Sequence, residues 1–202
     1  NLRKLKVCGS KSVSEFEADL SQLSLLESLK FSNVYIEKLV FHKRSRLKTF
    51  EVFGSRDFME FDLSELEYLK DIVFNRVGIR SLIFPKKSSL KTFEVIESSL
   101  ADNILDAIPP SISILKCCDI NVPQVSFPSN RKLDSISLNY SLYHEGVYKS
   151  LQSRNLYIHI TGGDILEAII IPSQITTLTI EDDHLFQPRE TNRMVFFPSP
   201  LS

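Results

Sequence analysis

The sequence predicts an α/β repeat solenoid with short parallel strands on its concave face and alternating extended and short helical segments on its convex face. One pattern, apolar-x-x-apolar-x-apolar, recurs along the chain, and successive copies begin 20 to 24 residues apart. A period of this length is typical of a solenoid that contributes one short strand per turn. The nine copies begin at Leu2, Leu26, Leu47, Leu69, Leu90, Ile112, Leu133, Asn155 and Ile175.

The repeats come in pairs, because the starts at 26, 69, 112 and 155 are each 43 residues apart. In the first type of repeat, the strand is followed by an apolar cluster that ends in Phe-Pro or a variant of it, and we expect an extended segment there. These clusters are 36–41, 79–85, 122–128 and 165–172. In the second type, apolar residues lie three or four apart, which predicts a helical turn or two. These segments are 65–67, 102–108 and 145–151.

We expect residues 1–202 to form a single solenoid domain that belongs to a longer array. Leu201 follows Pro198 as Ile175 follows Pro172, so it is expected to begin a tenth repeat. Free repeat arrays normally carry polar capping ends. Neither Leu2 nor Leu201 has such a cap beside it.

The segments 69–74 (LKDIVF) and 90–95 (LKTFEV) resemble the L-x-x-L-x-L signature of leucine-rich repeats, and this resemblance covers essentially the entire chain. One feature departs from that family, since the ninth repeat position alternates between serine, as in Ser55 and Ser98, and an apolar residue in place of asparagine. Serine hydroxyls are expected to replace part of the asparagine hydrogen bonding. The doubled unit with Phe-Pro is similar to the arrays of fungal or protist F-box-type adaptors.

Composition narrows the classes of partner. Lys plus Arg total 24 and Asp plus Glu total 25, a net charge of −1, so nucleic acid is not a favoured partner. No apolar run approaches the roughly 20 residues needed to span a bilayer, so no membrane partner is predicted. The three cysteines are few and odd in number, which favours a reducing, intracellular compartment, cytoplasm or nucleus. We expect Cys117 in the core and Cys118 in a more accessible place.

No motif predicts catalysis, a cofactor or a metal. The histidines, His42, His144, His159 and His184, lack the surroundings of a nucleophilic triad. Gly162-Gly163-Asp164 lacks the spacing of a phosphate-binding loop, and Asp182-Asp183 lacks an alternating ligand loop. The sequence therefore favours a protein that is not an enzyme.

Side chains alternate across a strand, so the residues between the inward positions face outward on the concave side. Several of these residues are apolar or aromatic and have charged neighbours, as a protein-binding hot spot requires. His159 is interpreted as a contact residue in preference to a catalytic base. The candidate partner-binding residues are Val73, Ile114, Tyr157, His159, Phe53, Ile96, Tyr140, Glu51, Glu94 and Lys116.

The function predicted is a non-catalytic protein–protein interaction module that binds a protein partner on its concave face. The resemblance to F-box-type adaptors implies the substrate-recognition part of a ubiquitin-ligase adaptor. Two alternatives stay open: a structural scaffold subunit of a larger assembly, and the repeat region of an enzyme whose catalytic domain lies outside these residues.

Overall fold

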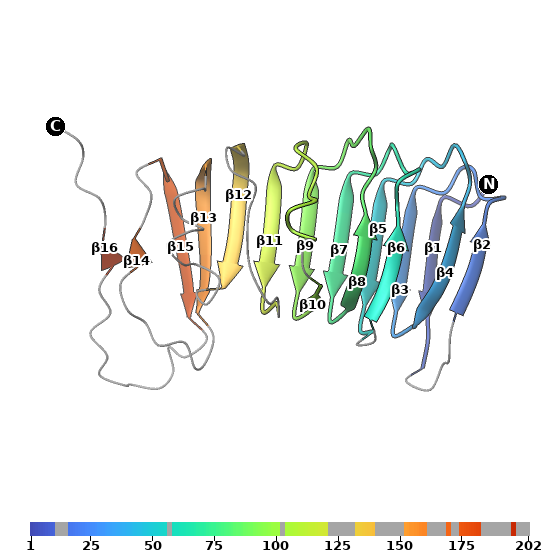
Figure 1. The fold of residues 1–202 in the computed structure, drawn as a ribbon, viewed down its shortest axis with the longest axis horizontal. Helices are drawn as coiled ribbons and strands as arrows, with labels where there is room; N and C mark the ends of the chain where they lie inside the picture. Colours follow the sequence, from blue (N-terminus) through green and yellow to red (C-terminus); the bar gives the residue numbers. More distant parts are fainter. Residues whose placement is uncertain are drawn as a thin grey trace.

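A computed structural model shows an all-β parallel solenoid in which successive turns stack side by side (Figure 1). Each turn places one strand in a long front sheet, and seven of the turns also place a second, described strand in back sheets. The structure describes residues 1–10, 16–55, 58–101, 104–120, 132–139, 152–160, 169–170, 174–182 and 195–196.

The front sheet has nine strands, all parallel, each paired with the strand of the next turn. Register partners are 20 to 24 residues apart, which confirms the repeat period predicted from the sequence. The strands are β1 (Lys4–Cys8), β3 (Ser28–Ser32), β5 (Thr49–Phe53), β7 (Asp71–Asn75), β9 (Thr92–Ile96), β11 (Ile114–Cys118), β12 (Lys132–Asn139), β13 (Gln152–Ile160) and β15 (Thr177–Asp182).

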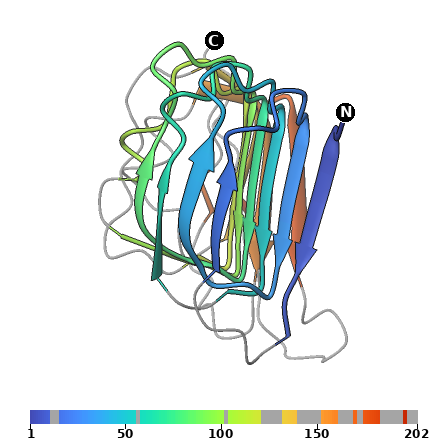
Figure 2. The same cartoon turned by 90° about the vertical axis from the view of Figure 1, so that its right-hand side faces the viewer.

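The back of the solenoid is made of short parallel strands that face the front sheet across the core (Figure 2). They form sheets of two, three and two strands. The strands are β2 (Phe16–Leu20) with β4 (Ile36–Phe41), then β6 (Phe58–Asp62), β8 (Gly78–Ile83) and β10 (Ser99–Leu100), and finally β14 (Ile169–Ile170) with β16 (Val195–Phe196).

A ladder of phenylalanine rings fills the core between front and back. Phe31, Phe50, Phe74 and Phe93 come from successive front strands and are fully buried. Their ring centroids are 6.4, 6.1 and 6.3 Å apart, with the planes nearly perpendicular. This is the edge-to-face arrangement that aromatic quadrupoles favour. The back sheets add further rings, among them Phe61, whose centroid is 5.5 Å from that of Phe50 and 5.2 Å from that of Phe74.

The prediction of an α/β fold with helical segments is wrong, because the described residues contain no helix. Leu63, Leu66 and Leu69 are three residues apart, and the N–H of each later leucine donates to the carbonyl of the one before, at 3.0 Å. Such i to i−3 bonds close tight turns, whereas an α-helix needs i to i−4 bonds. The described part of 102–108 also forms a turn, and 145–151 lies outside the described residues.

The back of the second repeat type is a strand as well, since β6 alternates exposed and buried residues from Phe58 to Asp62. The extended segments predicted for the first type are confirmed at β4 and β8. Residues 122–128 and most of 165–172 lie outside the described residues. The described residues also contain no helix that is long and apolar enough to span a membrane.

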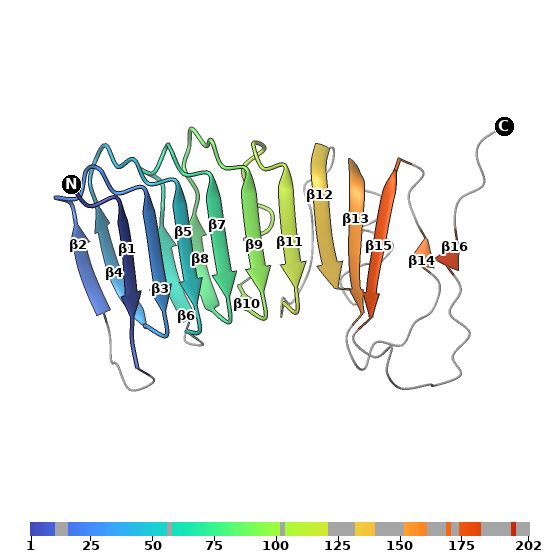
Figure 3. The ribbon, with the colours of Figure 1, turned by 180° about the vertical axis from the view of Figure 1, so that it is seen from behind.

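The front sheet runs along the whole length of the stack, with its strands side by side (Figures 1 and 3). Helices pack 8–10 Å apart, whereas strands lie about 4.8 Å apart, so strands on the back of a turn occupy less space along the stack than the predicted helical segments would. The outer face of the front sheet is therefore an elongated surface.

Left-handed corner residues follow the front strands β3, β5, β7, β9 and β11. Their φ angles lie between 47° and 75°. Side chains disfavour this conformation by about 1–2 kcal/mol, and hydrogen bonds between turns offset the cost. For example, Asn33 N–H donates to the Phe53 carbonyl at 2.7 Å. These corner residues are Asn33, Gly54, Arg76, Glu97 and Asp119.

Buried serines next to the corners make some of the hydrogen bonds that asparagine makes at the ninth position of leucine-rich repeats. Ser98 Oγ accepts a hydrogen bond from Val77 N–H of the preceding turn at 3.0 Å and donates one to the Ile96 carbonyl at 2.7 Å. Ser98 is only 4% exposed. The expectation that serine hydroxyls contribute hydrogen bonding at this repeat position is therefore confirmed at Ser98.

Replacing Phe50 with Ala should lower the free energy of unfolding by about 3–5 kcal/mol, because it removes a ring at the centre of the ladder and leaves a cavity. Phe58→Ala is the matched control, since that ring is 47% exposed and should cost less than about 1 kcal/mol. Denaturant unfolding monitored by circular dichroism measures both. Equal losses of unfolding free energy in the two variants would show that the phenylalanine ladder does not stabilise the core more than an exposed ring does.

Ser64→Ala should raise the pKa of Asp62 toward its ordinary value. Hydrogen bonds from the Ser64 hydroxyl and from Ser64 N–H, the latter at 3.0 Å, lower that pKa in the folded protein. A carboxyl whose pKa is lowered by folding stabilises the fold above its unfolded pKa, and this contribution is lost as pH falls through the folded pKa. The variant should therefore lose less stability than wild type on acidification.

The pKa is measured by NMR titration of the Asp62 carboxyl. Asp19 makes the equivalent bond to Ser21 N–H at 2.9 Å two turns earlier, so its pKa should stay unchanged as an internal reference. Ser64→Thr retains the hydroxyl and should behave as wild type. An unchanged Asp62 pKa in Ser64→Ala would contradict the assigned cause.

Candidate interaction surface

The outer face of the front sheet presents three residues from each five-residue strand, because alternate residues point away from the core. The burial patterns of β3, β5, β7 and β9 show this directly, with half-buried residues at the first, third and fifth positions. The in-register pairing lines these residues up in three columns across the turns. We call them the first, middle and last columns.

Phe53, Val73 and Ile96 form one half-buried apolar group on neighbouring strands. Phe53 and Ile96 both lie opposite Asn75, in the last column, and Val73 lies two residues before Asn75 in β7. Val73 is therefore a diagonal neighbour of both Phe53 and Ile96, whereas Asn75 lies between Phe53 and Ile96. These three predicted partner-binding residues thus lie on the same face of three neighbouring strands.

Ile114 and Tyr157 are the most exposed large apolar residues described on the front sheet, at 40% and 38%. They do not lie in one column. Ile114 lies opposite Thr92 and Ser135 in the first column, whereas Tyr157 lies opposite Ser137 and Thr179 in the middle column.

The eighth copy of the repeat pattern begins two residues earlier than the sequence predicted. Ser153, not Asn155, pairs with Leu133, and Ser153 is 1% exposed. A buried serine at an apolar repeat position hid this register. Because a strand repeats its faces every two residues, Tyr157 remains outward.

The middle column carries most of the predicted charged contacts. Across six consecutive strands it reads Glu51, Val73, Glu94, Lys116, Ser137 and Tyr157. Charges of both signs therefore lie within one or two strands of the apolar side chains. In the last column, the backbone of His159 pairs with Asn139 and Glu181. Tyr140 lies outside the described residues.

Lys30 covers one face of the Phe53 ring. Its Nζ lies 3.9 Å from the centroid of the Phe53 ring and 2.9 Å from Glu51 Oε2. A cation over an aromatic face is attracted by the ring quadrupole. Phe53 is therefore already engaged within the chain, which leaves Ile114 and Tyr157 as the more available apolar side chains of the sheet.

The two adjacent cysteines are both buried, Cys117 in the core and Cys118 at the last outward position of β11, opposite Ile96. Cys117 is fully buried and burial raises the pKa of its thiol well above the ordinary range. The expectation that Cys118 is accessible is wrong, since it is 3% exposed and its Sγ lies 3.3 Å from Ser137 Oγ. Among the residues described, no three His, Cys, Asp or Glu side chains gather closely enough to hold a metal.

Only Cys8 should react with a thiol reagent in the native protein, because it is exposed while Cys117 and Cys118 are buried. Titration with a chromogenic disulfide should give one fast thiol without denaturant and three with it. Cys8→Ser should abolish the fast reaction. A fast reaction that persists in this variant would place Cys117 or Cys118 at the surface.

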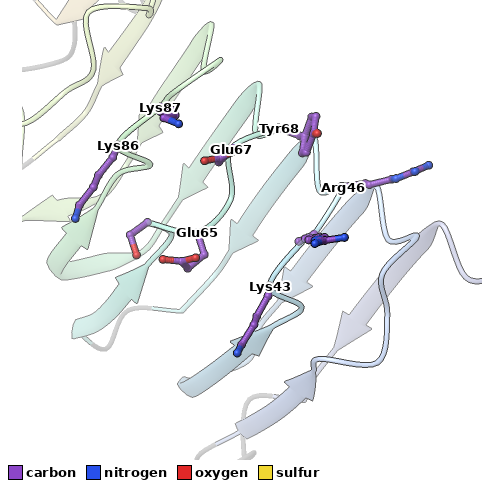
Figure 4. Close-up of a pocket in the computed structure, with 10 residues that line it drawn as sticks. Lys43, Arg46, Glu65, Glu67, Tyr68, Lys86 and Lys87 are labelled. Atoms are coloured by element: carbon purple, nitrogen blue, oxygen red, sulfur yellow. The ribbon is translucent and has the colours of Figure 1, made fainter.

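A second feature lies along the edge where the chain passes from the back strands to the front sheet. Three consecutive turns line a groove of about 540 Å³ there, which we call the edge groove (Figure 4). Its charged and aromatic lining residues are Lys43, Arg44, Arg46, Glu65, Glu67, Tyr68, Lys86 and Lys87.

The edge groove was not predicted from the sequence, although the sequence contains a signal for it. Lys43-Arg44 and Lys86-Lys87 are 43 residues apart, the length of the doubled repeat. A basic pair that recurs at this period must occupy the same place on the solenoid, two turns apart. The outward columns alone could not reveal it, because these residues lie outside the front strands.

No protein-family model, curated protein or solved structure matches this chain.

Proposed function

We propose that this chain is a non-catalytic protein-binding module whose binding surface is the outer face of the front sheet. The observation that carries the proposal is the exposure of Ile114 and Tyr157, at 40% and 38%, on a regular sheet face. Aromatic and aliphatic side chains among polar neighbours are typical anchors of protein interfaces.

The dimensions of the face support this proposal. Nine strands about 4.8 Å apart, each at least five residues long at about 3.3 Å per residue, give a face of at least roughly 40 by 16 Å, or about 640 Å². A standard interface buries about 800 Å² on each partner, and the smallest stable interfaces bury about 600 Å². The front sheet alone is therefore large enough for a specific complex.

The rigidity of the face also supports it. Ile114 and Tyr157 lie on β11 and β13, each of which is paired with the strands of both neighbouring turns. Buried apolar residues of the same strands, such as Leu115 and Leu156, hold these strands on the core. A surface that is ordered before binding loses little conformational entropy when a partner docks. Such a module suits an adaptor or a scaffold, which holds a partner in a fixed orientation.

Replacing Ile114 and Tyr157 together with Ala should weaken capture of a protein partner at least about tenfold while leaving the melting temperature nearly unchanged, because both side chains contribute contact area and little core packing. The experiment uses the immobilised chain as bait in a cell extract, with bound proteins quantified by mass spectrometry. A protein lost by the variant is then purified, and its affinity for wild type and variant is measured.

The matched control is Val40→Ala with Ile83→Ala, which removes two similarly exposed apolar side chains, 39% and 50%, from the back strands. This control should retain the partner. Loss of the partner in the control, or its retention in the front-sheet variant, would move the binding site away from the front sheet. A large fall in melting temperature of the front-sheet variant would show that its two side chains are structural.

A further inference from the structure

The edge groove concentrates positive charge on a chain whose net charge is −1. Five cations and two carboxylates line it, which gives a local net charge of +3. Within the described residues, none of these seven side chains forms an ion pair. Elsewhere on the solenoid neighbouring turns do pair their charges, as Lys48 and Glu27 do at 2.7 Å.

The charges are ordered by turn. The first turn supplies Lys43, Arg44 and Arg46, the next supplies Glu65 and Glu67, and the third supplies Lys86 and Lys87. Figure 4 shows Glu65 between Lys43 on one side and Lys86 on the other. The groove therefore reads positive, negative, positive along the solenoid axis, with successive signs about 4.8 Å apart.

This order disfavours a uniform polyanion. A nucleic acid presents negative phosphates at every step of its backbone, so some of them would face Glu65 and Glu67. Like charges held at close range are destabilising, and this effect suppresses wrong partners. A ligand that matches the groove carries a cation between two anions.

We propose that the edge groove is a second protein-binding site, which takes a helical segment with an acidic, a basic and an acidic residue along one face. An α-helix rises 1.5 Å per residue, so residues i, i+4 and i+7 share one face and lie about 6 and 10.5 Å apart along its axis. Three turns of the solenoid present their charges at about 4.8 and 9.6 Å. The spacing of the helix side chains and the spacing of the groove charges differ by about 1 Å, which long side chains can span.

Tyr68 gives this site its apolar contact. It is the most exposed large apolar residue described, at 59%, and stands at the rim of the groove (Figure 4). Exposed ion pairs contribute little individually, so charge alone sets the orientation of the segment and its rate of encounter. Burial of the Tyr68 ring against the segment would supply the apolar part of the binding.

The test is an NMR titration of the 202-residue chain with an end-blocked, alanine-based helical peptide that carries Glu, Lys and Glu at i, i+4 and i+7. Saturable chemical-shift changes confined to residues 43–46, 64–68 and 86–87 are expected. Because the site offers few contacts, peptide concentrations up to about the millimolar range are needed. An isomeric peptide with the same residues at i, i+2 and i+5 should bind about tenfold more weakly. Equal binding of the two peptides, or no shifts in the groove with either, overturns the proposal.

Two pairs of variants sharpen the result. Lys43→Glu with Lys86→Glu should weaken the patterned peptide about tenfold, whereas Lys6→Glu with Lys116→Glu, which changes net charge equally on the front sheet, should not. Glu65→Gln with Glu67→Gln should weaken the patterned peptide but strengthen binding of heparin, used as a uniform polyanion. If the Gln variant strengthens both ligands, the groove is a simple anion site and the helical segment is excluded.

Discussion

Edge-to-face packing of phenylalanine rings between neighbouring turns is the interaction on which this solenoid depends. Phe31 and Phe74 occupy the second inward position of their strands, whereas Phe50 and Phe93 occupy the first. The rings therefore alternate in height along the stack, and each fits beside the next without a face-to-face clash. This alternation explains why the sequence repeats every 43 residues although the backbone repeats at half that length.

The same ladder determines what the surface can do. Once ring packing holds the turns in register, residues about 21 positions apart in sequence become neighbours, and surface charges interact across turns. Arg76 and Glu97 illustrate this, with two hydrogen bonds at 2.7 and 3.1 Å between adjacent corners. The Lys30–Glu51 pair on the front sheet and the ordered charges of the edge groove have the same origin.

The sequence predicted the period, the pairing of repeats and the inward positions of most front strands, because apolar burial leaves a direct trace in residue type. It misassigned the back of the second repeat type, since leucines spaced by three suit both a helix and successive tight turns, and the difference lies in the hydrogen bonds that close them. It misplaced the eighth strand because Ser153 is buried among apolar neighbours. Of the candidate surface, it predicted exposure at Ile114 and Tyr157 but not their separation in different columns.

The constant register of the front strands limits where the length of such a chain can change. Register partners in the front sheet are 20, 21, 22 or 24 residues apart, yet the inward pattern survives in every strand. Length changes must therefore be absorbed between strands, since a single inserted residue within a strand would exchange its buried and exposed faces. An insertion or deletion in a connection can therefore change the edge where the groove lies while it leaves the aromatic interior in place.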